Sequence, residues 1–324
     1  MSDVFILGAG FSKAIFSQML LLPELSDEVE KFWLANNRRP AICDLFRREL
    51  ELWLSFLLED HPWLMEAENL RNRALGLDAL GAIKNRLFVR EEIAVGYECP
   101  TWFTQLVEYW RTNSVSVFTL NYDSLVERCA ASLGIKTGNL YPVPLTPSGQ
   151  RLGAVLAAKH TSTFRLFKLH GSGSWFYSGS EFARGETIYY IPYTGWSQTP
   201  APEDPMVASI ADKAPLIVPP RFNKGNYLRH ETVHQLWTRA SYALQAAKRV
   251  FVLGYSLPPT DLEMRYFLAT NTKNGSPAVY VVDKNPEIIE RFAAVFNNPS
   301  INQQFVYDGE PIPAFVDALT SEQL

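Results

Sequence analysis

The sequence has few cysteines and no excess of charge of either sign. Its 324 residues include three cysteines, Cys43, Cys99 and Cys129, which form no CxxC pair. Three scattered thiols supply neither a disulfide framework nor a four-thiolate zinc site. Lys and Arg number 30 against 34 Asp and Glu, whereas nucleic-acid-binding domains normally carry a basic excess. We therefore expect no direct contact with nucleic acid.

Long hydrophobic runs are also missing. The apolar segment at residues 4–7 has no basic stretch before it and leads directly into glycines, unlike a signal peptide. The run at residues 19–22 is far shorter than a membrane span. We expect a soluble, cytoplasmic protein with no membrane segment, and a composition that is 47% hydrophobic suffices for a large core.

Short apolar runs with strand character recur along the chain, and most are followed by helix-like periodicity. They occupy residues 4–7, 115–120, 165–169, 216–218, 250–253 and 279–282. This alternation predicts an α/β fold with a parallel sheet covered by helices on both faces. Residues 36–100 are helix-like and charged, which predicts a helical lobe inserted into a domain formed by residues 1–35 and 101–324. Residues 173–215 are predicted to be an irregular or hairpin region.

Polar residues and glycines gather where these strands end, which is where ligands bind in parallel α/β folds. The first strand ends in Gly8-Ala9-Gly10-Phe11-Ser12, and glycines before a helix let the backbone approach a phosphate. Lys13 replaces the third glycine of the GxGxxG fingerprint, and the acidic residue expected at the next strand end is missing. An ordinary dehydrogenase is therefore disfavoured.

Four later strand ends carry side chains suited to chemistry. Asn121 and Asp123 follow the second strand, and an amide at a buried strand tip needs a partner, whereas Asp123 by itself could cap the next helix. His170, beside a glycine, could deprotonate water or a ribose hydroxyl. Ser256 and Asp283 suit a ribose or phosphate, although each could also serve a turn or a helix cap.

The motifs GAGFS, TLNYD, KLHGS and GYSLP, with the strand-end Asp283, resemble the Sir2-like family. Within that family they are similar to the branch of bacterial anti-phage defence proteins that degrade NAD+. The resemblance implies a Rossmann-like NAD-binding domain with a helical lobe. It also implies the residues that bind NAD+: Gly8, Ala9, Gly10, Phe11, Ser12, Gly254, Ser256 and Asp283.

The resemblance further implies that Asn121 and Asp123 address the nicotinamide ribose and its leaving group, with His170 as the base. The activity expected is an NAD+ glycohydrolase that releases nicotinamide and ADP-ribose, or a cyclic product, with NAD+ as substrate and no metal. The four zinc-binding cysteines of deacylating sirtuins are absent, and residues 16–23 read FSQMLLLP in place of a GIPxFR run. These departures disfavour a channel for acyl-lysine peptides.

Two other functions remain open from the sequence. The same pocket could sense NAD+ or ADP-ribose without cleaving it, although a sensor could lose Asn121 or His170 and this chain has both. Alternatively, His230, Glu231 and His234 match the HExxH pattern of zinc peptidases. Two histidines on a solvated helix face would produce the same pattern without any metal.

Unregulated NAD+ cleavage would kill the cell that makes the enzyme, so we expect the activity to be gated. A homo-oligomer, a regulatory partner chain or a phage-derived trigger could provide the gate. The lobe at residues 36–100 is the expected surface, because it carries a set of aromatic residues: Phe46, Trp53, Phe56 and Trp63.

Overall fold

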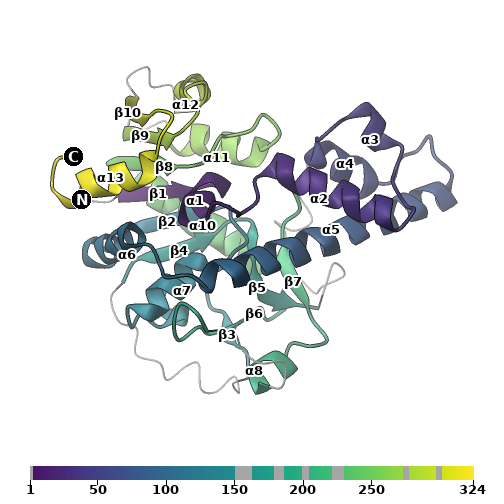
Figure 1. The fold of residues 1–324 in the computed structure, drawn as a ribbon, viewed down its shortest axis with the longest axis horizontal. Coiled ribbons are helices and arrows are strands. Elements are labelled where there is room, and N and C mark those ends of the chain that lie inside the picture. Colours follow the sequence, from purple (N-terminus) through teal and green to yellow (C-terminus); the bar gives the residue numbers. More distant parts are fainter. Residues whose placement is uncertain are drawn as a thin grey trace.

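A six-stranded parallel sheet forms the centre of the computed structural model (Figure 1). The structure describes residues 3–149, 163–178, 186–198, 204–220, 230–272, 277–296 and 301–324. In spatial order the strands are β10 (Asn302–Val306), β9 (Ala278–Asp283), β8 (Arg249–Leu253), β1 (Asp3–Leu7), β2 (Ser116–Thr119) and β4 (Arg165–Lys168). The predicted α/β class is confirmed.

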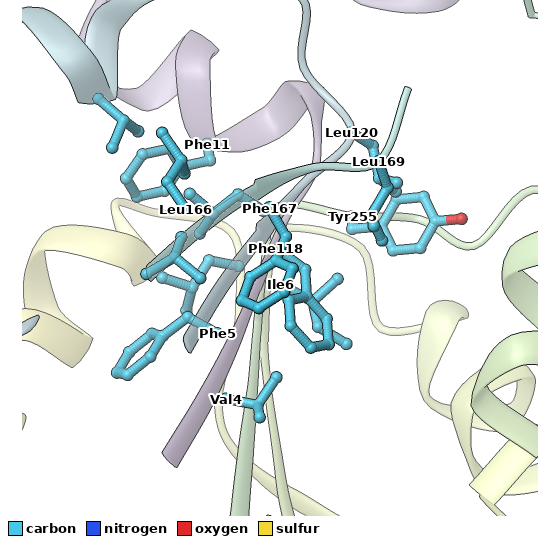
Figure 2. Packing of buried hydrophobic residues seen from close by; sticks show 14 of the residues in the cluster. Val4, Phe5, Ile6, Phe11, Phe118, Leu120, Leu166, Phe167, Leu169 and Tyr255 are labelled. Atoms are coloured by element: carbon cyan, nitrogen blue, oxygen red, sulfur yellow. The ribbon is translucent and has the colours of Figure 1, made fainter. Parts of the chain in front are cut away.

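Helices cover both faces of this sheet, as predicted. On one face α6 packs against α7 and α13, and on the other α11 packs against α10 and α12. Their bounds are α6 (Thr101–Asn113), α7 (Leu125–Ser132), α10 (Glu231–Gln245), α11 (Leu262–Asn271), α12 (Ile288–Phe296) and α13 (Pro311–Thr320). Because both faces are covered, β1 is buried along its whole length, and its side chains meet those of β2 and β4 in one core (Figure 2).

The order of the strands places a topological switch point between β1 and β8. The chain runs from β1 to β2 and β4 on one side, then returns to add β8, β9 and β10 on the other side. In open α/β sheets the crevice at such a point, outside the carboxyl ends of the strands, is the usual ligand site.

A second, four-stranded sheet contains a strand, β5 (Gly171–Tyr177), that begins three residues after the end of β4. The order of this sheet is β3 (Thr146–Pro147), β6 (Tyr189–Tyr190), β5 and β7 (Ala214–Ile217), and β5 is antiparallel to both β6 and β7. The run at residues 216–218 therefore does not belong to the parallel sheet, because it pairs with the hairpin strand β5. Two short helices, η1 (Thr137–Asn139) and α8 (Pro205–Ala208), complete this region.

A helical unit lies between α1 (Ala9–Ile15) and α6. It consists of α2 (Leu22–Ala35), α3 (Ile42–Leu45), α4 (Leu50–Leu57) and most of the long α5 (Glu66–Val95), which runs back to the main sheet (Figure 1). The unit has its own apolar core, to which α2 contributes Leu25, Val29 and Trp33. The division of the chain at residues 36 and 100 stays a prediction.

Two of the aromatic residues expected on the surface of this unit differ in burial. Trp53 is fully buried, with its ring 5.8 Å from that of Trp33, whereas Trp63 is 71% exposed. Trp53 therefore stabilises the core of the unit rather than its surface. In the described ranges, no helix has the length and apolar character that crossing a bilayer requires.

Candidate active site

The predicted site residues lie at one edge of the parallel sheet. Ser12 is in α1, directly after β1, Asn121 and Asp123 follow β2, and His170 follows β4. Because β1, β2 and β4 are adjacent and parallel, these residues come from the same, carboxyl edge. Leu120 and Leu169, at the ends of β2 and β4, share a core with Tyr255, which follows β8 (Figure 2).

Three polar side chains at this edge form a continuous hydrogen-bond chain. The amide nitrogen Nδ2 of Asn121 donates to Ser12 Oγ at 2.8 Å, and Ser12 Oγ donates to Asp123 Oδ2 at 2.6 Å. Asn121 Nδ2 also donates to the backbone oxygen of Gly8 at 2.8 Å. The structure thus joins the loops after β1 and β2 through the side chains that the sequence singled out.

These contacts fix the orientation of the Asn121 amide. The Gly8 carbonyl can only accept a hydrogen bond, so the NH2 group of Asn121 must face it. Both amide hydrogens are then used inside the protein. The side chain can therefore offer its oxygen, Oδ1, as an acceptor for a hydroxyl group of a ligand.

Asp123 is surrounded by protein atoms, although its side chain keeps some contact with solvent. Burial raises its carboxyl pKa to about 6, a shift that the positive charge of Lys168 opposes and the negative charge of Glu91 reinforces. Its Oδ1 also accepts from Leu125 N at 3.3 Å, at the start of α7. The helix-cap role that the sequence allowed for Asp123 is therefore present beside its contact with Ser12.

A buried ion pair holds the loop that carries Asn121 and Asp123. Lys168 Nζ lies 3.0 Å from Glu127 Oε1, both side chains are almost fully buried, and Lys168 also donates to the backbone oxygen of Asp123. Tyr141 Oη donates to the same Glu127 oxygen at 3.2 Å. No site role was predicted for Lys168, although a lysine at the carboxyl end of a strand, two residues before His170, was a signal that could have identified it.

A second buried network ties α5 to α7. Arg128 Nε donates to Glu91 Oε1 at 2.8 Å, and its Nη2 donates to Glu92 Oε1 at 2.8 Å. Glu91 also accepts from the backbone nitrogen of Ser124, the residue after Asp123. The end of the long helix α5 therefore contacts the segment that leads out of the site.

The glycines of the first loop approach another part of the chain very closely. A Cβ on Gly8 would lie 2.5 Å from Tyr255 Cα, and one on Gly10 would lie 2.8 Å from Gly254 O. Gly254 has a φ of +60°, and a Cβ there would lie 2.4 Å from Phe11 N. These glycines let the loops after β1 and β8 pack together at the switch point.

Several groups of this loop are engaged within the protein. Gly10 N donates to Gly254 O, and Phe11 N donates to Gly8 O, each at 2.9 Å. Phe11 is buried against the rings of Trp102 and Phe103, so its side chain belongs to the core. In this conformation the backbone N–H groups of Gly10 and Phe11 are already hydrogen-bonded within the protein and do not point to a ligand as donors. Ala9, by contrast, is exposed at the start of α1.

His170 lies at the junction of the two sheets. It is 7% exposed, its backbone oxygen accepts from Val218 N at 2.9 Å, and its Nε2 lies 3.8 Å from Asp261 Oδ1. Gly171, at a φ of +79°, has no room for a side chain because Leu216 O would lie 2.1 Å from its Cβ. From the sequence, Asp261 was not predicted to belong to this site, because it lies more than 90 positions from His170 and at no strand end.

Ser256 and Asp283 lie apart from the hydrogen-bonded cluster. Ser256 is exposed, and its backbone oxygen accepts from Arg291 Nη1 at 3.0 Å. Asp283 is half-buried, which raises its carboxyl pKa, and its Oδ1 accepts from Asn285 N at 2.9 Å. Within the described ranges neither side chain is hydrogen-bonded to Asn121.

The HExxH pattern does not present two matched imidazoles. His230 is fully buried before α10 and accepts from Thr232 N through Nδ1, whereas His234 is exposed. Among the described residues there is no cluster of three or more His, Cys, Asp or Glu side chains that could hold a metal ion. This geometry gives the zinc-peptidase alternative no support.

Comparison with known proteins identifies the family. No curated protein matches the chain. Similar solved structures include one described under the mechanism and regulation of Sir2 enzymes, with 13% identity and a TM-score of 0.43 over 100% of this chain and 94% of that one. Another, described as Sir2 with a p53 peptide and NAD+, has 12% identity and a TM-score of 0.44 over 100% and 93%. The family model of the SIR2-like domain matches residues 115–302, more than half of the chain, and the protein therefore belongs to the SIR2-like domain family.

Proposed function

We propose that the protein is an NAD+ glycohydrolase that cleaves the bond between nicotinamide and ribose. Its membership of the SIR2-like domain family supports a function that uses NAD+. The observation that carries the finer proposal is the hydrogen-bond chain from Asn121 through Ser12 to Asp123 at the carboxyl edge of the sheet. This edge also carries His170, a group able to take up a proton.

The donors and acceptors at this edge fit a ribose. Asn121 offers Oδ1 to a hydroxyl group, because its two hydrogens are engaged with Gly8 and Ser12. Asp123 supplies a carboxylate that Ser12 orients. We expect a pyrophosphate at the glycine loop to bind through groups other than Gly10 N, which donates to Gly254.

The proposed reaction converts NAD+ and water into nicotinamide, ADP-ribose and a proton. Loss of nicotinamide passes through an oxocarbenium-like transition state, as in glycoside hydrolysis. The carboxylate of Asp123 and the oxygen of Asn121 are suited to stabilise the positive charge that develops on the ribose. His170 would accept the proton of the attacking water, or of a ribose hydroxyl group if a cyclic product forms.

Chromatography of NAD+ incubated with the purified full chain tests this proposal. We expect free nicotinamide together with ADP-ribose, with any cyclic product resolved as a separate peak. Binding of NAD+ by calorimetry, with no nicotinamide released at any protein concentration or in the presence of an activating partner, would instead favour the sensor function.

The biological role proposed is anti-phage defence by depletion of NAD+, and it rests on the sequence resemblance alone. An activity of this kind needs a gate, such as self-association, a partner chain or a phage-derived trigger. Mass measurement with and without NAD+, coupled to a nicotinamide assay, tests the first of these. Activity that rises with protein concentration in step with assembly is the expected result, and full activity of the monomer would contradict it.

A further inference from the structure

Asp261 occupies the position of a helix cap, but its side chain does not cap the helix. It directly precedes α11, where an aspartate normally caps the helix, yet its side chain makes no cap hydrogen bond. Instead, its Oδ2 accepts from Tyr255 Oη at 2.7 Å, and its Oδ1 lies 3.8 Å from His170 Nε2. The carboxylate is thus directed toward the site instead of toward its own helix.

Both members of this pair are buried, Asp261 to 4% and His170 to 7% exposure. A buried carboxylate is costly unless it is paired and hydrogen-bonded. Burial and the charge of Asp261 raise the pKa of Tyr255 well above its usual value, so Tyr255 stays a hydrogen-bond donor to Asp261. Other charged groups near Tyr255 are Glu51 of α4 and Arg265 of α11.

The segment that carries Asp261 is held by the helical unit. Thr260, the preceding residue, donates through Oγ1 to Glu51 Oε2. Glu51 belongs to α4 and is 8% exposed, so its carboxylate is buried, whereas Thr260 keeps some contact with solvent. A chain of contacts therefore leads from α4 through Thr260 and Asp261 to His170, over elements far apart in sequence.

We propose that Asp261 is a positioning residue for His170 and that Glu51, through Thr260, holds Asp261 in place, so that the helical unit controls the site. This inference rests on the proposed function. A carboxylate facing Nε2 favours the tautomer with the proton on that nitrogen and leaves Nδ1 as the basic one. It also stabilises the imidazolium that forms when His170 accepts a proton. The separation of 3.8 Å exceeds a hydrogen bond, and such contacts often shorten once substrate binds.

The first test is Asp261→Asn in the full chain, which removes the charge and keeps the shape. We expect kcat for nicotinamide release to fall on the order of 100-fold, the scale of a misplaced catalytic group, while KM changes little. The NMR titration midpoint of the His170 ring should move down by roughly one to three pH units, the effect of losing an adjacent opposite charge. His170→Gln identifies this signal among those of the five histidines.

Two further variants make the result specific. Asp261→Glu keeps the charge, so we expect it to retain the titration midpoint of His170 and to recover part of kcat. Asp308→Asn, which removes a carboxylate in an exposed turn, is the matched control and should leave both readouts unchanged. An unmoved midpoint in Asp261→Asn, or equal losses in the Asn and Glu variants, would overturn the role of Asp261.

Thr260→Val tests the link to the helical unit, because it removes only the hydroxyl group that reaches Glu51. We expect a lower kcat at unchanged KM, with only a modest fall of the thermal midpoint, and Glu49→Gln, an exposed neighbour of Glu51, is the control. An unchanged kcat in Thr260→Val overturns this link. If the chain releases no nicotinamide at all, the proposed function fails, whereas the titration of His170 still decides the role of Asp261.

Discussion

Ser12 and Asp123, 111 positions apart in the sequence, are joined by a hydrogen bond of 2.6 Å. This contact unites the loops after β1 and β2, and it makes Ser12 the link between the amide of Asn121 and the carboxylate of Asp123. The polar edge of the sheet is thus one connected group of side chains.

Ser12→Ala should break this group while leaving the fold intact. The substitution removes the hydroxyl group that is hydrogen-bonded to both Asn121 and Asp123. Losing these hydrogen bonds costs about 1–3 kcal/mol of unfolding free energy. We expect NAD+ cleavage to fall roughly 10- to 100-fold, because Asn121 and Asp123 lose their common anchor. Ser17→Ala, an exposed serine just after α1, is the matched control in the same assay. Equal activity of the two variants would show that Ser12 does not organise the site.

The pKa of Asp123 gives a prediction for stability against pH. Burial raises it from 3.8 to about 6, so the folded chain holds this proton more tightly than the unfolded chain. The contribution of Asp123 to stability is therefore fully present below pH 3.8 and is lost as the pH rises through 6.

The side chain introduced by Asp123→Asn cannot ionise, so the variant should not show this loss of stability with rising pH. The unfolding free energies of the variant and of the unsubstituted chain are measured with denaturant. As the pH rises from 3.8 to 6, that of the variant is expected to increase relative to that of the unsubstituted chain. A difference between the two proteins that stays constant across this range would contradict the raised pKa.

Gly254→Ala should destabilise the contact between the loops after β1 and β8. The residue has a φ of +60°, and its Cβ would overlap Phe11 N, so we expect a loss of at least about 1–3 kcal/mol. Gly81→Ala in α5 is the control, because a Cβ there meets nothing within 4 Å. Helix propensity predicts that Gly81→Ala stabilises by about 0.5–1 kcal/mol. Thermal unfolding of both variants provides the check.

Lys168→Met should leave the carboxylate of Glu127 buried without its cation. Breaking a buried ion pair in this way costs about 3–5 kcal/mol. Adding Glu127→Gln removes the second charge and is expected to restore much of the loss. Lys31→Met, in a pair whose lysine is 69% exposed, should cost less than about 1 kcal/mol. A double variant no more stable than Lys168→Met would refute this account of the pair.

The sequence predicted the fold and part of the site correctly where the pattern of apolar runs and helices could be combined with the rule for where ligands bind in parallel sheets. Buried runs followed by helices predict a parallel sheet, and a parallel sheet brings its strand ends together, so Ser12, Asn121 and His170 could be assigned to one edge. The close packing of Gly10 on Gly254 could not be predicted, because glycine before a helix equally suits a phosphate. The contact depends on two segments more than 200 positions apart.

Other features were hidden because a simpler explanation fitted the sequence. Asp261 has the sequence context of a helix cap, and only the structure directs its side chain to His170. A glutamate in a helix such as α4 is expected on the solvent-exposed face. In the structure the carboxylate of Glu51 is buried and accepts a hydrogen bond from Thr260. The apolar run at 216–218 has the composition of a parallel strand, but the strand β7 that it overlaps pairs with β5 and so belongs to the second sheet.

Release of nicotinamide from NAD+ tests the central claim most directly. The purified full chain, Asn121→Ala and the Ser17→Ala control are incubated with NAD+ at several protein concentrations, and nicotinamide is quantified by chromatography. The account predicts release by the unsubstituted chain and by the control, and none by Asn121→Ala, although all three proteins are folded. Undiminished release by Asn121→Ala, or bound NAD+ that no variant cleaves at any concentration, would contradict it.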